Sequence, residues 1–298
     1  MPSSTPQRRD VTLPQPRDRR LDQAVGPLQP QDLILTIFGA YVRDKGQQVW
    51  SGGMVKILGE FGFTTGAARA ALGRLVNRDL LARRREGRQA FYGLTSRAEA
   101  LLNDGDRRIF SFGRCAGGTD QWTVIWHSIP ENRRVTRSRF ASRLRFLGFG
   151  TVQDATWIAA RDREQDVRLI LDELKIADYV SLMVGRMSQV TPFPPVVSQA
   201  WRLDDACRRY ESFLSEFGKP GQVGVELSLP AEAFRIRTLM LHRFRSFPFV
   251  DPELPEPIDP VRRLRSLVLK RFEELYEQLE IPASTYFWQK VTAESHLT

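Results

Sequence analysis

The spacing of apolar residues predicts a group of helices near the start of the chain. Between Leu33 and Val42 the apolar positions recur at i, i+1, i+4 and i+5, which is the pattern of one buried helical face. A second helix is predicted from Ser51, a residue that can cap it, to about Phe61. Glycine and polar residues separate the two segments, so we expect short helices joined by turns.

A third helix is predicted from a cap at Thr64 or Thr65 to about Arg78. At about 100° per residue, its core face consists of Ala68, Leu72, Leu75 and Val76. The opposite face consists of Gly66, Ala70, Gly73 and Asn77, with Arg69 and Arg74 on its flanks. Each glycine in an exposed helix costs about 1 kcal/mol relative to alanine. The two glycines therefore indicate that something approaches the helix backbone closely.

Two interpretations of this smooth face remain open. Such a helix can lie deep in the major groove of DNA, where Asn77 reads a base. In that position the neighbouring arginines, Arg69, Arg74 and Arg78, reach bases or phosphates. The alternative is a helix that packs against another domain through its small residues.

The segment Leu80–Thr95 predicts two short strands joined by a tight turn at Glu86-Gly87. Three helices followed by a hairpin with a basic tip is the order of a winged helix-turn-helix, in which one helix enters the major groove. In this interpretation the hairpin grips the DNA backbone or the adjacent minor groove through Arg84, Arg85 and Arg88.

The charge of this region also favours nucleic-acid binding. Between Phe61 and Ala100 there are eight arginines and no lysine, against Asp79, Glu86 and Glu99, which leaves +5 of the chain's net charge of +9. The planar guanidinium group suits phosphates and guanine edges. On charge alone, a solvated arginine-rich surface is an equally good interpretation, so the order of elements carries the prediction.

The central part of the chain alternates between strand and helix patterns. Strands are predicted at Trp122–Ile129, Gly150–Ala160 and Tyr179–Val184, and helices at Val135–Leu147 and Glu164–Leu174. This order predicts a small ferredoxin-like α+β domain.

Three apolar stripes at helical spacing follow the proline-rich segment Thr191–Pro195, which is interpreted as a linker or ordered crossover. They run from Trp201 to Phe217, from Ala233 to Phe247 and from Val261 to Leu279. Such stripes usually form a core, and the alternative is that one of them forms a dimer face.

These patterns define a multidomain α+β protein. Its predicted parts are a disordered leader (residues 1–30), a winged-helix DNA-binding domain (31–97), a connecting helix and linker (98–118), a ferredoxin-like domain (119–190) and a C-terminal helical domain (191–298). The leader combines prolines and arginines with few apolar residues, so we interpret it as a passive tail rather than a DNA contact.

Several classes of protein are disfavoured by composition. No apolar run approaches the roughly 20 residues that span a bilayer, and no export signal is present, so the cytoplasm is expected. Cys115 and Cys207 are the only cysteines, and the three histidines are scattered, which disfavours a disulfide scaffold or a zinc site. The sequence contains no Gly-x-Ser-x-Gly or Gly-x-x-x-x-Gly-Lys motif, and we expect neither an enzyme nor a bound cofactor.

The chain resembles the PaaX family of repressors of phenylacetate catabolism, from roughly Pro30 to Leu279. The first matching part contains Leu33–Val42, Val49-Trp50, Ala68–Val76 and Phe91–Thr95. The second contains Trp122, Ser128–Glu131, Leu147–Gly150 and Ala155–Ile158, and is similar to the family's central Cas2-like ferredoxin fold. The third contains Leu239–Arg245 and Phe247–Pro255, and is similar to the family's C-terminal helical domain. The order and spacing of these motifs carry the resemblance.

The resemblance implies a homodimeric repressor that binds a double-stranded operator and is released by an aryl-acetyl coenzyme A thioester such as phenylacetyl-CoA. Two departures qualify this expectation. Gly73 stands where relatives more often carry a side chain, which bears on the operator sequence. After Pro255 the chain runs Glu-Pro-Ile-Asp-Pro in place of the family's Asp-Trp-Pro-Gly-like stretch, which bears on the effector.

An acyl-CoA carries several phosphate charges, so its pocket needs cations. The candidates are Arg133, Arg134, Arg137 and Arg139 in the central domain, and His242, Arg243 and Arg245 in the C-terminal domain. The alternatives are a solvated basic face for the first group and a packed histidine for His242.

Other functions also remain open. A Cas2-like fold raises the possibility of metal-dependent nuclease activity, but the first strand has no carboxylate until Glu131. A nucleic-acid-processing or RNA-associated protein and a ligand-independent architectural DNA binder are the alternatives to the repressor.

Overall fold

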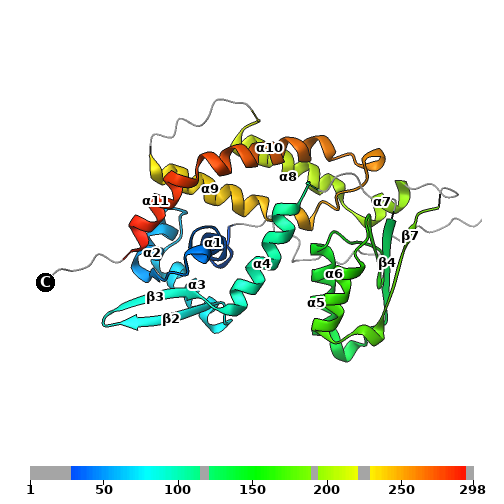
Figure 1. Cartoon of the computed structure of the whole chain (residues 1–298), viewed down its shortest axis with the longest axis horizontal. Coiled ribbons are helices and arrows are strands. Elements are labelled where there is room, and N and C mark those ends of the chain that lie inside the picture. The colour runs from blue at the N-terminus through cyan, green and yellow to red at the C-terminus, as the bar shows by residue number, and fades with distance from the viewer. Residues whose placement is uncertain (1–27, 115–120, 189–193, 221–228, 293–298) are drawn as a thin grey trace, which may run out of the picture.

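A basic hairpin extends from one end of the molecule, and a row of C-terminal helices spans its opposite side (Figure 1). The computed structural model describes residues 28–114, 121–188, 194–220 and 229–292. Most of the predicted leader and of the predicted linker Thr191–Pro195 lies outside these residues, as does Cys115. None of the helices in the described ranges is long and apolar enough to cross a membrane.

The first part of the chain contains the three predicted helices and the predicted hairpin. They are α1 (Pro30–Ile37), α2 (Ser51–Gly59), α3 (Thr65–Asn77), β2 (Leu81–Glu86) and β3 (Gln89–Leu94). α1 continues through a π-helical turn, Phe38–Val42, and a 3-10 turn, Arg43–Lys45, and ends where Gly46 adopts a φ of +57°. A short strand that the pattern did not predict, β1 (Val49–Trp50), pairs with β3 and gives an antiparallel sheet in the order β1-β3-β2.

A long helix, α4 (Ser96–Ser111), leaves this unit directly after the hairpin. Thr95 caps it, because its Oγ1 accepts a hydrogen bond of 3.2 Å from the backbone N–H of Ala98. α4 runs from the hairpin toward the C-terminal helices and the central domain (Figure 1).

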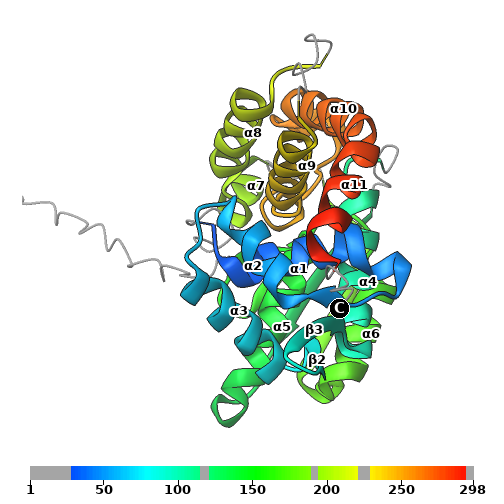
Figure 2. The same cartoon turned by 90° about the vertical axis from the view of Figure 1, so that its left-hand side faces the viewer.

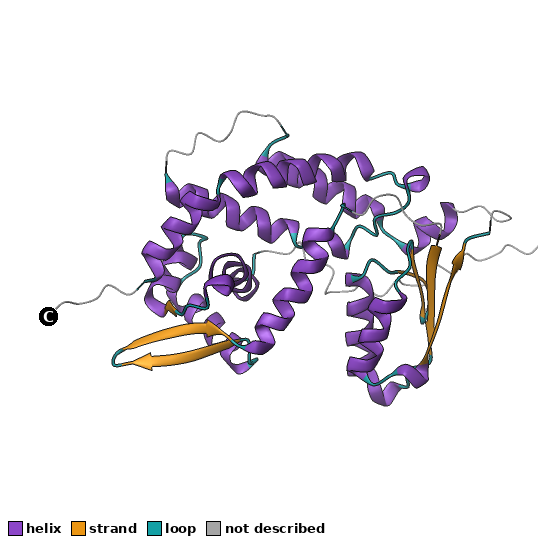
Figure 3. Cartoon of the chain, in the orientation of Figure 1, coloured by secondary structure: helices purple, strands orange, loops and turns teal. Residues whose placement is uncertain are grey.

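The central domain is a four-stranded antiparallel sheet with two helices. Its elements are β4 (Gln121–His127), α5 (Arg134–Phe146), β5 (Gly150–Gln153), β6 (Thr156–Ala159), α6 (Glu164–Leu174) and β7 (Val180–Arg186), and the strand order is β5-β6-β4-β7. α5 and α6 cover one face of the sheet, which stands apart from the hairpin of the first unit (Figure 3).

The prediction of a single strand over Gly150–Ala160 was wrong. The chain turns at Asp154-Ala155, where Ala155 has a φ of +60°, and the two halves pair with each other as β5 and β6. The apolar pattern did not reveal this turn because Ala155 is neither glycine nor asparagine, the residues that usually mark a left-handed position.

The three predicted apolar stripes correspond to α8 (Leu203–Phe217), α9 (Pro230–Phe244) and α10 (Arg262–Gln278). A short helix, α7 (Pro194–Ala200), precedes them, and a last helix that was not predicted, α11 (Glu280–Val291), follows α10. α11 packs against both α9 and α2. Seen from the side of the hairpin, α8–α11 lie on one side of α1 and the hairpin lies on the other (Figure 2).

One hydrophobic core joins the first unit to the C-terminal helices. Tyr41 of the first helical segment packs its ring 5.1 Å from Phe287 of α11 and 5.3 Å from Phe234 of α9. The central domain has its own core, formed by residues such as Ile125, Phe140 and Val167. The first unit and the C-terminal helices are therefore held together by apolar contacts. α5 and α6 form a separate core with one face of the central sheet, and a third cluster joins sheet residues such as Trp122 and Ile158 to Trp201 and Leu254 of the C-terminal part.

Candidate nucleic-acid interface

The exposed face of α3 is the centre of the candidate interface. Its buried face consists of Ala68, Ala71, Leu72 and Leu75. Its exposed positions are Thr65, Gly66, Arg69, Ala70, Gly73, Arg74, Asn77 and Arg78, the last lying one residue beyond the helix. Thr64, also exposed, is the N-cap, because its Oγ1 accepts a hydrogen bond of 3.2 Å from the backbone N–H of Ala67. The predicted cap and the two faces of this helix are thus present in the fold.

Neither glycine of α3 is needed to fit another part of the described chain. A methyl group at Gly66 or Gly73 would meet no other atom of the described residues within 4 Å. Packing of this face against a described part of the same chain is therefore excluded. The smooth strip stays open to an external molecule.

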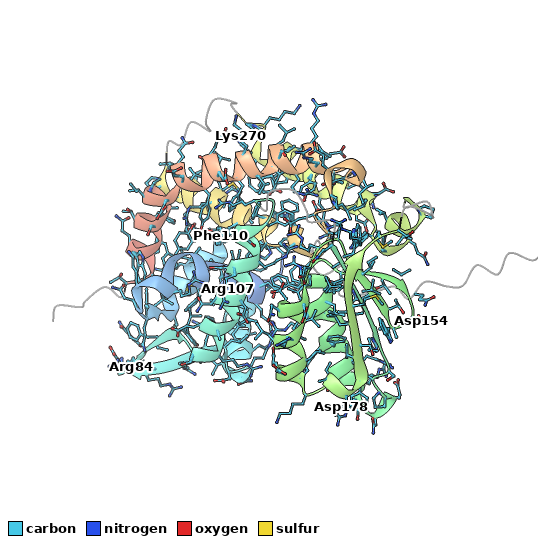
Figure 4. The ribbon with its side chains drawn as sticks, turned by 45° about the vertical axis from the view of Figure 1, so that its right-hand side comes forward. Arg84, Arg107, Phe110, Asp154, Asp178 and Lys270 are labelled. Atoms are coloured by element: carbon cyan, nitrogen blue, oxygen red, sulfur yellow. The ribbon has the colours of Figure 1, made fainter. Side chains whose placement is uncertain are left out.

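The hairpin beside α3 extends outward from the molecule (Figure 1). β2 and β3 pair from Leu81↔Leu94 to Glu86↔Gln89. The predicted turn at Glu86-Gly87 lies one residue further on, because the two connecting residues are Gly87, with a φ of +57°, and Arg88. Glycine at the first position of a two-residue turn provides the positive φ that such hairpins require. Arg84 lies near the outer end of this hairpin (Figure 4).

Most guanidinium groups on this surface have no protein partner. Within the described part of the chain, the arginine side chains without a hydrogen bond or ion pair include Arg69, Arg78, Arg83, Arg85 and Arg88. Arg84 differs, because its Nη2 lies 2.8 Å from Glu86 Oε1 with both side chains more than half exposed. Arg74 is also engaged, since Gln31 accepts a hydrogen bond of 3.1 Å from its Nη2 when the amide oxygen faces it. Five free guanidinium groups thus lie on one helix face and on the hairpin.

The candidate effector residues fall into two separate groups. Arg133 donates a hydrogen bond of 3.2 Å to the carbonyl of Lys175 and lies over the ring of Tyr179, and Arg134 is exposed in the first turn of α5. Arg137, on the same helix, pairs with Glu131 at 2.6 Å, and Arg139 is exposed. All four belong to the central domain, whereas the other candidates lie at the end of α9.

The α9 group contacts the first helix. His242 Nδ1 lies 3.0 Å from Thr36 Oγ1, and Arg245 Nη1 donates to the same hydroxyl at 2.6 Å. Burial, together with the charges of Arg245 and Arg243, lowers the pKa of His242 to about 4. Burial also lowers the pKa of Arg245, while Arg243 lies 3.5 Å from Glu216. His242 and Arg245 therefore connect the C-terminal helices to α1.

Glu131, the first carboxylate after β4 along the chain, is 71% exposed and paired with Arg137. Within the described ranges, no group of three or more histidine, cysteine, aspartate or glutamate side chains is arranged to hold a metal ion.

Two further features escaped the sequence patterns. A cavity of about 730 Å³ lies where α7 and α8 meet the segment Glu256–Pro260, and four carboxylates and two arginines line it: Asp204, Asp205, Glu256, Asp259, Arg202 and Arg208. A buried ion network joins Arg108 of α4, Glu253 and Arg161. Its only signal in the sequence is the pair of acidic residues, Asp251 and Glu253, inside the proline-rich motif Phe247–Pro255.

The helix-and-hairpin unit, the four-stranded central domain and the C-terminal helices define a three-part α+β protein. The chain belongs to the PaaX family, as its resemblance predicted: the family's models match residues 29–98 (PaaX-like protein), residues 117–196 (PaaX protein central Cas2-like domain) and residues 201–289 (PaaX-like protein C-terminal domain).

Individual relatives agree with this assignment. The transcriptional repressor PaaX of Escherichia coli (strain K12) is 25% identical over 242 residues, which cover 78% of this chain and 75% of the repressor. The solved structure of the uncharacterized protein Rv0674 from Mycobacterium tuberculosis is similar with a TM-score of 0.51 and 16% identity, covering 84% of this chain and 96% of that chain. At that identity the second likeness supports the fold alone.

Proposed function

We propose that this protein is a cytoplasmic, dimeric transcriptional repressor that reads operator DNA with a winged helix-turn-helix. The observation that carries the proposal is the uncovered face of α3, where Gly66 and Gly73 meet no other described atom and free arginines lie alongside. A helix with such a face fits the major groove closely. The basic hairpin then lies along the backbone or the adjacent minor groove, as wings do. The relationship to a transcriptional repressor supports this assignment.

In this proposal Asn77 reads a base edge, because it is exposed in the last turn of α3 and its amide matches the edge of adenine. Arg69, Arg74 and Arg78 reach bases or phosphates from the flanks of the same face, and Thr64 and Thr65 present hydroxyls at its start. Arg84, Arg85 and Arg88 hold the backbone. Two copies would place two such helices in neighbouring half-sites.

We further propose that an aryl-acetyl coenzyme A thioester, typified by phenylacetyl-CoA, releases the repressor from DNA. The thioester would bind the conformation that does not hold the operator, and so shift the population away from DNA. A coupling free energy of about 1.4 kcal/mol suffices for a tenfold loss of occupancy. The contacts of His242 and Arg245 with Thr36 support the α9 group as a route from a ligand to α1.

The test is a fluorescence anisotropy titration of the full chain onto its own upstream intergenic DNA, at fixed salt, with and without phenylacetyl-CoA. We expect tight binding relative to random DNA that collapses when the thioester is added. Tight binding that ignores the thioester would retain the repressor and reject this effector. Equally weak binding to every duplex would reject the repressor in favour of an architectural or nucleic-acid-processing protein.

A further inference from the structure

Glu253 occupies a strained position at the junction of the three parts of the fold. It lies in the buried segment after α9 and adopts a φ of +55°, which is rare for a residue with a side chain. Its backbone N–H donates a hydrogen bond of 2.7 Å to Asp251 Oδ1, and Arg265 Nη2 donates to the same oxygen at 2.7 Å. Such a conformation persists only where the surroundings fix it, and it is typical of functional sites.

The carboxylate of Glu253 receives donors from two other parts of the protein. Arg108 of α4 pairs with its Oε2, and the backbone N–H of Gly113 donates to its Oε1 at 2.7 Å. Arg161, which follows β6 of the central domain, lies 3.5 Å from the same carboxylate and donates to the carbonyl of Glu253 at 3.3 Å. The side chains of Arg108 and Glu253 are only 6% and 4% exposed. One buried carboxylate therefore joins α4, the central domain and the C-terminal part.

A third guanidinium group lies beside this network. Buried Thr123 of β4 donates to the carbonyl of Arg161 at 2.8 Å and accepts from the backbone N–H of Arg163 at 2.9 Å, which fixes the segment that carries both arginines. Arg163 pairs with Asp166 at 2.9 Å. Burial, and then the charges of Arg108 and Arg161, lower the pKa of Arg163. Arg163 therefore lies close enough to Arg108 and Arg161 for their charges to act on it.

This cluster has more donors than the described chain uses. Four of its nitrogen atoms are shielded from solvent and make no hydrogen bond to any described residue: Arg108 Nη2, Arg161 Nε, Arg163 Nε and Arg163 Nη2. Three guanidinium cations face two carboxylates, Glu253 and Asp166, and Asp166 is 44% exposed. A buried donor without an acceptor is costly, and a cation excess inside a protein favours an anion.

We propose that Arg108, Arg161 and Arg163 form a binding site for the oxyanion of a small ligand, a phosphate or a carboxylate group, at the junction of the three parts. The planar fork of arginine matches both groups in two-point contact. The ligand shares the arginines with Glu253 or displaces it, and so changes the anchorage of α4. Since α4 begins directly after the hairpin, this contact couples the site to the DNA-binding unit; this coupling rests on the proposed function, whereas binding of the anion does not.

The site is tested by isothermal titration of the full chain with inorganic phosphate, phenylacetate and phenylacetyl-CoA, each alone. We expect saturable binding of at least one probe, weakened about tenfold or more in Arg163→Gln, since about 1.4 kcal/mol of a charged hydrogen bond is lost. The matched control is Arg168→Gln, which removes an exposed arginine of α6 paired with Glu164 and should leave binding unchanged. The probe that binds distinguishes a phosphate site from a carboxylate site.

Arg163→Lys separates a loss of binding from a folding defect, because lysine keeps the positive charge but lacks the planar guanidinium group. Weakened binding in Arg163→Lys with an unchanged melting temperature supports the site. Wild-type protein that binds none of the probes, or binding that survives Arg163→Gln, overturns it. The coupling is tested separately on operator DNA. Release by thioester that is unchanged in Arg163→Gln overturns the regulatory role of the site and leaves the repressor itself intact.

Discussion

Among the arginines of the hairpin, Arg84 forms an ion pair with Glu86, whereas Arg85 and Arg88 have no partner in the described chain. An exposed pair of this kind contributes little to stability, and free guanidinium groups are available to phosphates. We predict that Arg85→Ala and Arg88→Ala each weaken operator and random DNA alike, and each lower the slope of log affinity against log salt by about 1. The measurement is a salt series of anisotropy titrations. Arg168→Ala on α6 is the control, and a loss confined to the operator would contradict a phosphate role.

Asn77 differs from these arginines in what it can recognise. Its amide offers one donor and one acceptor, which match the major-groove edge of adenine. We predict that Asn77→Ala reduces the difference in binding affinity between the operator and operators with a changed base. The expected loss of binding free energy at the preferred base pair is about 1–3 kcal/mol. Competition against single-base operator variants would show this effect. Equal losses on every sequence would show that Asn77 reads no base.

His242 links stability to pH. Its folded pKa of about 4 lies below its ordinary value of 6.5, so the unfolded chain binds the proton more readily. The stabilisation from keeping this imidazole neutral is therefore complete above about pH 6.5 and is lost as the pH falls toward 4. We predict that this group accounts for up to about 3 kcal/mol of lost stability in that window. Urea unfolding of wild type and His242→Gln at several pH values measures it, and parallel pH curves for the two proteins would refute the assignment.

At the scale of an element, two glycines in neighbouring helices have opposite roles. A Cβ on Gly73 of α3 would meet no described atom within 4 Å, whereas one on Gly53 of α2 would lie 2.7 Å from the Cα of Val291 in α11. We predict that Gly73→Ala stabilises the fold by about 1 kcal/mol through helix propensity yet weakens operator binding. Gly53→Ala should destabilise it by about 1–3 kcal/mol through overpacking. Chemical unfolding and operator titration of both variants separate the two roles, and a Gly73→Ala protein with full operator affinity would contradict close approach of DNA to α3.

The elements themselves differ in how far the sequence predicted them. α3 was predicted with its cap and faces because local features fix it, namely the Thr64 hydroxyl and the 3.6-residue repeat of Ala68, Leu72 and Leu75. The Asp154-Ala155 turn was missed because no local residue requires a left-handed backbone there. α11 was missed because it packs against α2 and α9, and these contacts are with residues far away in the sequence.

At the scale of the whole molecule, the division of hydrophobic cores predicts how the protein unfolds. Phe287 is fully buried in the core shared by the first unit and the C-terminal helices, and Phe140 is fully buried in that of the central domain. We predict that Phe287→Ala costs about 3–5 kcal/mol and increases hydrogen exchange in α1–α3 and α8–α11 together. Phe140→Ala, the matched variant, should affect the central domain alone. Protection lost only around α11 in Phe287→Ala would show that the first unit folds independently of the C-terminal helices.

The sequence by itself determined the helices and hairpin of the first unit, the concentration of arginine on them and the membership of the PaaX family, because periodicity, capping residues and motif order are local properties. The tertiary structure alone decided which polar groups meet. Arg108, Arg161 and Glu253 are separated by up to 145 residues, and His242 meets Thr36 across 206 residues. Such contacts depend on how the shared core brings distant helices together. Burial then shifts the pKa values of these groups and makes an unpaired charge costly. The open face of α3 depends on both the sequence and the tertiary structure. The sequence supplied its two glycines, and the packing of the other elements showed that nothing in the described chain covers them.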